Sequence, residues 1–190
     1  MLLLIFGIIL FFGVHSLSIV NEPWRDRMVN RLGEGAFKGI YSLISLLGLV
    51  LLVYGYGQAR LDPVLLYTPP IWLRHVSLLL LIPVFPLLFA TYLPGAIKRI
   101  LKQPMLVAVK LWALAHLLAN GMLADVLLFG SFLVWAIVDR ISMKKRIQRT
   151  VTKVQASKLN DVIAVVLGLV MYVFFVLWLH SALIGVALIA

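Results

Sequence analysis

Four histidines are the residues of this chain best able to do chemistry, and they lie in or beside separate apolar stretches: His15, His75, His116 and His180. An imidazole is costly to place inside a bilayer and needs a partner there, so an intramembrane histidine is by default a candidate functional residue. Imidazole nitrogens also ligate haem iron. The chain has no cysteine, which excludes thiolate ligands and c-type haem attachment. Histidine is therefore the main candidate ligand for any redox centre.

His116 lies in the most informative pattern. Trp112, His116 and Asn120 are spaced four residues apart, so we expect them to share one helical face with the imidazole in the middle. A hydrogen-bonded packing role is the alternative for a lone histidine on an apolar helix. The recurrence of histidine in other apolar segments favours ligation, and His116 is the strongest single candidate.

The other three histidines have different surroundings. His15 has a serine neighbour and a nearby glycine, which permit close approach of a ligand. His75 follows Arg74 near the outer end of its segment, where anchoring at the membrane interface is the favoured role. His180 is followed by serine, as His15 is, but two identical residues do not make a repeat. All three are kept as candidate binding residues.

Composition sets the class of protein that must position these histidines. Hydrophobic residues make up 63% of the 190 positions and charged residues 13%, too little polar surface to coat a water-soluble domain. We expect an all-α polytopic membrane bundle that forms a single domain over residues 1–190. About 20 apolar residues cross a bilayer. Six segments are expected to do so: 1–20, 37–56, 72–93, 105–119, 122–138 and 162–189.

Several polar and proline residues mark these segments. Pro83 and Pro86 should kink the third segment unless neighbouring groups satisfy the freed carbonyls. Pro104 is well placed to start the fourth segment, and the pair at 120–121, Asn-Gly, to stop it. Asp125 is expected to cap that turn, with a proton relay as the alternative. Among seven carboxylates it is the main one inside a segment, so a paired-carboxylate site is not expected.

Positive charge predicts the orientation. Fourteen of the 17 Lys and Arg residues lie in the links after the first, third and fifth segments, against Arg60 and Arg74 on the other face. Because positive links stay in the cytoplasm, both termini should lie outside it. The first segment has no positive residue before its apolar run, so we interpret it as a retained helix and not a cleaved signal peptide.

The link between the fifth and sixth segments is the most basic part of the chain. Its basic residues recur every four positions: Lys145, Arg149 and Lys153. A second face is apolar and consists of Ile147, Val151 and Val154. This pattern predicts a helix along the cytoplasmic interface, and a solvated basic loop is the alternative. Topology and anionic lipid account for the net charge of +10 without a nucleic-acid partner.

Several specific motifs are spread along nearly the whole chain. The most specific is the run Leu-Trp-Ala-Leu-Ala-His-Leu-Leu-Ala-Asn-Gly at 111–121. The others are His15-Ser16, Arg-Leu-Gly-Glu-Gly-Ala-Phe at 31–37, Tyr-Ser-Leu-Ile-Ser at 41–45, Gln-Pro-Met at 103–105, and His180 with Gly185-Val186. Together these motifs resemble those of the NnrU family of bacterial membrane proteins.

The resemblance implies a location and a cofactor. Bacterial members of the family are associated with nitrite and nitric oxide reduction, which implies the inner membrane and respiratory or denitrification enzymes as partners. The similar plant 15-cis-zeta-carotene isomerase holds a haem b between two histidines, which fall on His15 and His116. A family histidine before the fourth segment is replaced by Gln103, and a further isomerase histidine falls near Ala59. If isomerisation needs that histidine, this chain does not share the activity.

Depth in the bilayer leaves the ligand pair open. At about 1.5 Å per residue, His15 lies on the order of 9 Å from the cytoplasmic end of its segment, and His116 roughly 17 Å from the cytoplasmic start of its own. By depth, His75 and His180 fall on the same outer side as His116, so either could replace His15 as the second ligand. The cations that could pair with haem propionates are Arg25, Arg27, Arg31 and Lys110 towards the cytoplasm, and Arg74 outside.

Three classes of function follow. The first is a haem b protein with a redox or isomerase-like role. The second is a non-catalytic assembly or accessory factor for a respiratory reductase. The third is a small-molecule transporter, for which Pro83, Pro86 and Lys110 are the sequence hints. The sequence carries no nucleotide-binding, zinc-hydrolase or serine-hydrolase motif, and it specifies neither catalytic residues nor an oligomeric state.

Overall fold

The computed structural model describes residues 1–147, 149 and 152–188, and almost all of its regular structure is helical. Within these residues the sole β-type pairing is one isolated bridge between Leu65 and Met122. The helices group into two compact units. Unit 1 comprises Met1–Pro69 and Asn120–Gln148, and unit 2 comprises Pro70–Ala119 and Arg149–Ala190. The prediction of a single domain over residues 1–190 stays a prediction.

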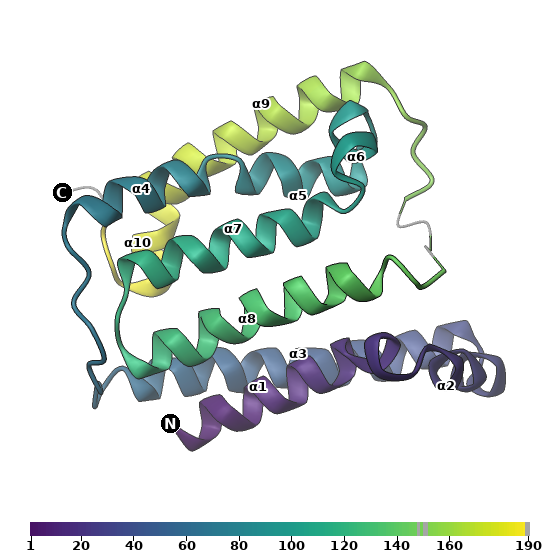
Figure 1. Cartoon of the computed structure of the whole chain (residues 1–190), viewed down its shortest axis with the longest axis horizontal. Helices are drawn as coiled ribbons and strands as arrows, with labels where there is room; N and C mark the ends of the chain where they lie inside the picture. The colour runs from purple at the N-terminus through teal and green to yellow at the C-terminus, as the bar shows by residue number, and fades with distance from the viewer. Residues whose placement is uncertain (148, 150–151, 189–190) are drawn as a thin grey trace. The chain divides into compact units, whose positions relative to one another are not determined.

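Unit 1 is built from four helices: α1 (Leu2–His15), α2 (Leu17–Leu32), α3 (Glu34–Ala59) and α8 (Leu123–Ser142). Helices α1, α3 and α8 run alongside one another, and α2 continues from α1 after a bend (Figure 1). The first, second and fifth expected segments lie on these helices.

Helices α1 and α3 pack antiparallel with their backbones in close approach at three glycines. A Cβ atom on Gly7 would lie 2.5 Å from the Leu52 backbone nitrogen, and one on Gly55 would lie 2.4 Å from that of Leu4. A Cβ on Gly48 would lie 2.8 Å from the backbone nitrogen of Phe11. Small residues allow such packing in membranes, where apolar side chains gain nothing by leaving lipid.

The first expected segment, 1–20, is not one straight helix. α1 ends at His15, and α2 starts at Leu17 with its axis bent by 52°. A second break follows at Asn21, whose backbone is not helical (φ −151°, ψ 80°). The Asn21 side chain accepts a hydrogen bond from the Trp24 backbone N–H at 2.9 Å, which caps the rest of α2. The prediction missed both breaks because the apolar run continues through the first of them.

The turn that joins α7 to α8 is held by the link that follows α3. Gly121 accepts hydrogen bonds from the backbone N–H groups of Leu66 (2.9 Å) and Tyr67 (3.2 Å). A Cβ on Gly121 would lie 1.8 Å from the Tyr67 carbonyl oxygen, so this position has room for glycine alone. Asp125, 3% exposed, accepts from the Met122 backbone N–H at 3.0 Å. The predicted capping role of Asp125 is confirmed.

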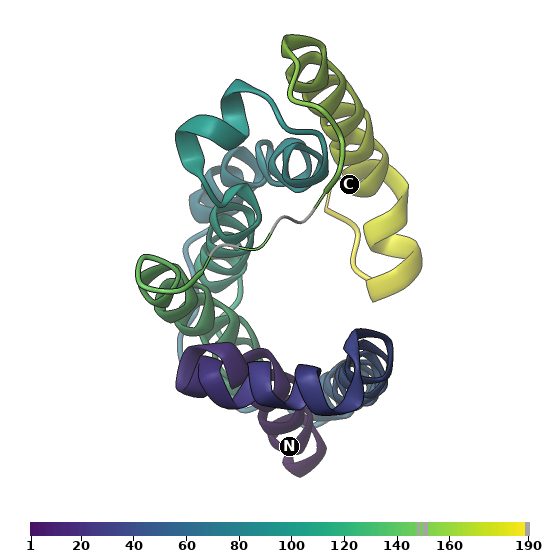
Figure 2. The ribbon, with the colours of Figure 1, turned by 90° about the vertical axis from the view of Figure 1, so that its right-hand side faces the viewer.

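Unit 2 contains the remaining elements: α4 (Trp72–Leu81), α5 (Val84–Tyr92), α6 (Ala96–Leu101), α7 (Pro104–Ala119), α9 (Lys158–Phe174), a π-helical turn (Phe175–Leu179) and α10 (His180–Ile184). Helix α7 begins at Pro104 and ends before the Asn-Gly pair, as predicted. Helix α5 lies beside α9 (Figure 2). A Cβ on Gly168 of α9 would lie 2.3 Å from the Pro86 nitrogen.

The third expected segment is interrupted at Pro83, as predicted. At the interruption the Ile82 N–H donates to the Leu79 carbonyl, three residues back, and not to Leu78. The Leu78 carbonyl instead accepts a hydrogen bond from the Tyr172 hydroxyl of α9 at 2.9 Å. A neighbouring helix therefore satisfies a carbonyl that the break releases, which is the condition under which prolines are tolerated in membrane helices.

Length and composition support a membrane protein. In the described part of the chain three helical stretches are long and apolar enough to cross a bilayer: Glu34–Ala59, Trp72–Tyr92 and Lys158–Ile184. The bent pair α1–α2 would be a fourth, and α7 is a shorter apolar helix. Helix α8 is also largely apolar but carries Asp125, Asp139 and Arg140. The protein is an all-α membrane helical bundle, as predicted.

The basic link between α8 and α9 forms no helix in its described residues between Met143 and Ser157. The alternative of a basic loop agrees with this, although Val151 of the expected apolar face lies outside the described residues. Like charges four residues apart destabilise a helix, and β-branched residues lower its propensity further.

The short helix α6 is stabilised at its start by α9. The Asp161 carboxylate of α9 accepts hydrogen bonds from the backbone N–H groups of Ala96 and Ile97.

Candidate functional site

His15 is the last residue of α1, and its ring is held by the backbone. Its Nδ1 lies 2.7 Å from the Phe11 carbonyl oxygen, four residues earlier. A carbonyl oxygen can only accept, so Nδ1 carries the proton and donates it. In a neutral imidazole the lone pair is then on Nε2, the nitrogen left to bind a metal. The end of α1 thus selects both the tautomer and the orientation of this histidine.

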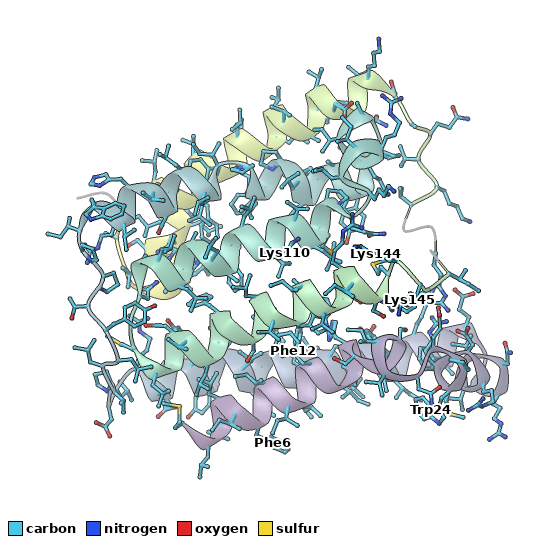
Figure 3. All side chains as sticks on the ribbon, in the orientation of Figure 1. Phe6, Phe12, Trp24, Lys110, Lys144 and Lys145 are labelled. Atoms are coloured by element: carbon cyan, nitrogen blue, oxygen red, sulfur yellow. The ribbon has the colours of Figure 1, made fainter. Side chains whose placement is uncertain are left out.

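Aromatic side chains surround the His15 ring. Phe11 stacks on it at 4.1 Å between ring centroids with a 25° interplanar angle. Tyr41 of α3 lies at 5.4 Å and Trp135 of α8 at 5.9 Å, the latter perpendicular to the imidazole. Figure 3 shows Phe12 on the side of α1 towards α8, where its ring packs on Phe132 at 4.9 Å. Helices α1, α3 and α8 therefore meet around His15.

One polar group of this cluster has no partner among the described residues. The indole N–H of Trp135 is buried, and no acceptor reaches it among the residues that the structure describes. Indole is a donor only, and a buried donor without an acceptor is unfavourable by about 1–3 kcal/mol.

A cavity of about 240 Å³ adjoins His15 on unit 1. It lies at the bend between α1 and α2, and α3 forms its other wall. Its lining residues are Val14, His15, Leu17, Ser18, Arg25, Phe37, Lys38 and Tyr41. Binding sites for small molecules usually measure roughly 300–1,000 Å³. This cavity can accept one edge or one substituent of a ligand, but not a whole porphyrin.

The two cations of the cavity are each paired with a nearby carboxylate. The Arg25 guanidinium donates to Asp26 at 2.9 Å and lies over the Phe37 ring at 5.2 Å. The Lys38 ammonium lies 2.6 Å from a Glu34 carboxylate oxygen one turn earlier, with both side chains well exposed. Exposed ion pairs contribute little, about 0–1 kcal/mol, so an entering anion can displace Glu34 from Lys38.

His116 repeats the local arrangement of His15. It lies in the last turn of α7, and its Nδ1 lies 2.8 Å from the Trp112 carbonyl oxygen, again four residues earlier. The Trp112 ring lies 5.1 Å from the imidazole. In both histidines, therefore, the residue at i−4 supplies a carbonyl acceptor and an aromatic ring. The expected proximity of Trp112 and His116 is confirmed.

Asn120 and Trp112 also have roles in the fold. Asn120 directly follows the last residue of α7, and its backbone carbonyl accepts from the Tyr67 hydroxyl at 2.7 Å. That its side chain shares the helical face of His116 stays a prediction. Trp112 packs against the core of unit 2 formed by Val84, Leu87 and Ala108.

His75 and His180 occupy different surroundings. His75 is exposed on α4, two residues from Ser77, which donates to the Ala115 carbonyl of α7 at 2.8 Å. Two residues are about 200° apart on a helix, so His75 lies on the side of α4 away from that contact. His180 is the first residue of α10, and its Nδ1 donates to the Val186 carbonyl at 2.7 Å, beyond Gly185 at φ +75°.

Several residues of the His15 site escaped the sequence analysis. Tyr41 and Trp135 are far from His15 in sequence, and only the packing of three helices brings them together. The aromatic residue four positions before each of His15 and His116 was a local signal that could have been noticed. A buried ion pair between Asp139 and Arg146 at the end of α8 was also missed. In the described residues no cluster of three or more His, Asp or Glu could hold a metal ion.

The fold defines this protein as a multi-pass helical membrane protein in which His15, His116 and His180 each donate a hydrogen bond to a backbone carbonyl. The family model described as NnrU protein matches residues 3–188, nearly the whole chain, and the chain belongs to that family. No curated protein and no solved structure matches it.

Proposed function

We propose that this NnrU protein binds haem b in the bacterial inner membrane, with His15 and His116 as the residues that would ligate the iron. One observation carries the proposal, namely the local arrangement that the two histidines share. Each ring donates its Nδ1 proton to the carbonyl at i−4 and contacts an aromatic ring at the same position. Neither His75 nor His180 has this arrangement.

The hydrogen bonds of His15 and His116 suit histidines that would hold a haem iron. A metal-bound histidine almost always donates its second ring N–H to a carbonyl or carboxylate, which fixes the ring and raises the basicity of the ligating nitrogen. The backbone carbonyls of Phe11 and Trp112 are these acceptors. The two histidines therefore need no carboxylate partner inside an apolar segment. The aromatic rings around His15 add apolar surface of the kind that packs on a porphyrin.

Haem b with two imidazole ligands supports one-electron transfer, and loss of one ligand would open a position for a small molecule such as nitric oxide. A redox or isomerase-like role linked to nitrite and nitric oxide metabolism is therefore our proposal for the activity, and both termini on the non-cytoplasmic side our proposal for the orientation. The link to nitrogen oxides rests on the family resemblance, and the orientation on the positive links. Gln103 and Ala59, in place of two histidines of the relatives, favour the redox role over isomerisation.

Absorption spectra test the proposal. We expect detergent-purified protein from haem-sufficient cells to show a Soret band that sharpens and shifts on reduction with dithionite, with resolved α and β bands. His15→Ala and His116→Ala should each weaken the low-spin spectrum, and added imidazole should restore part of it. His75→Ala is the matched control, because that side chain is exposed, and it should leave the spectrum unchanged.

A wild-type protein without a Soret band, even after incubation with hemin, would refute the haem proposal. An accessory-factor or transporter function would then be favoured over a haem-dependent one. A spectrum that depends on His116 and His180 but not on His15 would instead refute the assigned pair while keeping the cofactor.

A further inference from the structure

The cavity beside His15 combines an apolar wall with cationic and hydroxyl groups. Val14, Leu17 and the Phe37 ring form the apolar part, whereas Arg25 and Lys38 supply positive charge. Ser18 and Tyr41 contribute hydroxyl groups. Such a combination suits an amphiphile, whose acidic group would meet the cations while its apolar body follows the helices. We propose that this cavity binds a carboxylate or phosphate group attached to an apolar body, with Arg25 as the principal partner.

Arg25 is distinguished from the neighbouring cations by its position. Its side chain is 20% exposed and is held over the Phe37 ring, whereas Arg27 and Arg31 on the same helix are exposed and do not line the cavity. A guanidinium has five N–H donors, and the bond to Asp26 uses one of them. The remaining donors suit a planar carboxylate or a phosphate, which arginine binds with two parallel hydrogen bonds.

Two breaks in the chain precede Arg25. The axis of α2 is bent by 52° from that of α1, and a second break lies at Asn21, after which Arg25 lines the same cavity as His15. The volume of about 240 Å³ limits the occupant to one acidic group and the adjoining part of its body. The imidazole and the guanidinium can thus contact one ligand at two points.

Two sources could supply the acidic group, namely a propionate of the proposed haem b or the head group of an anionic phospholipid. The first deepens the function proposed above and rests on it, and the second does not. Hemin and its dimethyl ester distinguish the two sources, because the ester has the same iron and ring but no carboxylate.

The experiment compares wild type, Arg25→Gln and Arg31→Gln in nanodiscs of phosphatidylcholine. Each is titrated with hemin and with hemin dimethyl ester, and binding is followed by the Soret band. We expect Arg25→Gln to weaken hemin binding about tenfold, the loss typical of a charge-assisted hydrogen bond. Its affinity for the ester should equal that of wild type, which also shows that the variant is folded. Arg31→Gln should match wild type with both ligands.

A second measurement follows the lipid. Native mass spectrometry of the same three proteins in detergent with phosphatidylglycerol counts the retained lipids. Selective loss of phosphatidylglycerol from Arg25→Gln, with no selective effect on hemin, would assign the site to a lipid head group. If wild type binds no hemin at all, the haem proposal fails. The lipid measurement alone then tests whether the cavity binds an acidic group. If Arg25→Gln behaves like Arg31→Gln in both measurements, the acid site is refuted.

Discussion

The close packing of α1 on α3 predicts opposite effects for two neighbouring glycines. In Gly55→Ala the new methyl group would lie 2.4 Å from the Leu4 nitrogen, whereas ordinary contacts begin at 3.4 Å. The atoms that it meets belong to the backbone, so no side chain can rotate away. Gly57 lies two residues further along the same helix, where an added methyl group would have nothing within 4 Å, and it is the matched control.

The magnitudes separate the two variants. Alanine stabilises a helix interior by about 0.5–1 kcal/mol relative to glycine, and both variants gain this amount. Gly55→Ala must also move the two backbones apart by about 1 Å, and overpacking of this kind costs about 1–3 kcal/mol. That movement loosens Leu4 and Leu52, which are 0% and 2% exposed. Gly57→Ala should therefore stabilise the protein, and Gly55→Ala should be less stable than Gly57→Ala by about 1–3 kcal/mol.

The assay is reversible unfolding by SDS in mixed micelles, followed by circular dichroism and tryptophan fluorescence. Because the helix-propensity gain is common to both variants, the difference between their free energies of unfolding isolates the steric contact. Equal stability of Gly55→Ala and Gly57→Ala would refute the close approach of α1 to α3. It would also remove the basis for the position assigned to His15 beside α3.

Two further predictions concern hydroxyl groups that satisfy buried acceptors. Tyr56→Phe removes the donor to Asp125, 2.6 Å away and 3% exposed, and should lower the free energy of unfolding by about 1–3 kcal/mol in the same SDS titration. Tyr172→Phe removes the donor to the Leu78 carbonyl at the proline break and should cost about 0.5–1.5 kcal/mol, with faster amide hydrogen exchange around Pro83.

Exposed tyrosines provide the controls for these two variants. Tyr54, 58% exposed on the same helix as Tyr56, and Tyr92, 51% exposed at the end of α5, should tolerate phenylalanine with little change in stability. If Tyr56→Phe is no less stable than Tyr54→Phe, the hydrogen bond to Asp125 does not hold α3 to α8. Unchanged exchange near Pro83 in Tyr172→Phe would mean that another group satisfies the Leu78 carbonyl.

Much of the fold could be predicted from the sequence, because apolar runs and helix-terminating residues are local signals. Pro104 and the Asn-Gly pair marked both ends of α7, and Pro83 marked the interruption of the third segment. The bend at Ser16 could not be predicted, since no proline or glycine lies there and the apolar run continues to Val20. The tyrosine that stabilises the Pro83 break was equally hidden, because Tyr172 is 94 residues away from its partner.

The candidate site was predictable only in part. Histidine in an apolar segment is a signal in itself, and the structure adds the carbonyl four residues back that orients His15 and His116. The side chains around His15 come from three helices, so residue spacing along the chain could not predict that Tyr41 and Trp135 contact it. The hydrogen bond from the Tyr67 hydroxyl to the Asn120 carbonyl was also hidden, because the two residues are 53 positions apart in the sequence.

The three glycine contacts between α1 and α3 also determine where His15 lies along α3. The lipid-facing side of α1 is uniformly apolar, with Leu2, Phe6 and Ile9 exposed, so lipid alone would let the helix slide along its axis. Gly7, Gly48 and Gly55 each allow the backbone of the facing helix to approach closely, and they do so at one register only. A slip of one helical turn, about 5.4 Å, would place side chains where these glycines now lie, and it would move the imidazole away from Tyr41 and Trp135. The position of the candidate ligand relative to α3 is thus set by glycines that do not contact it.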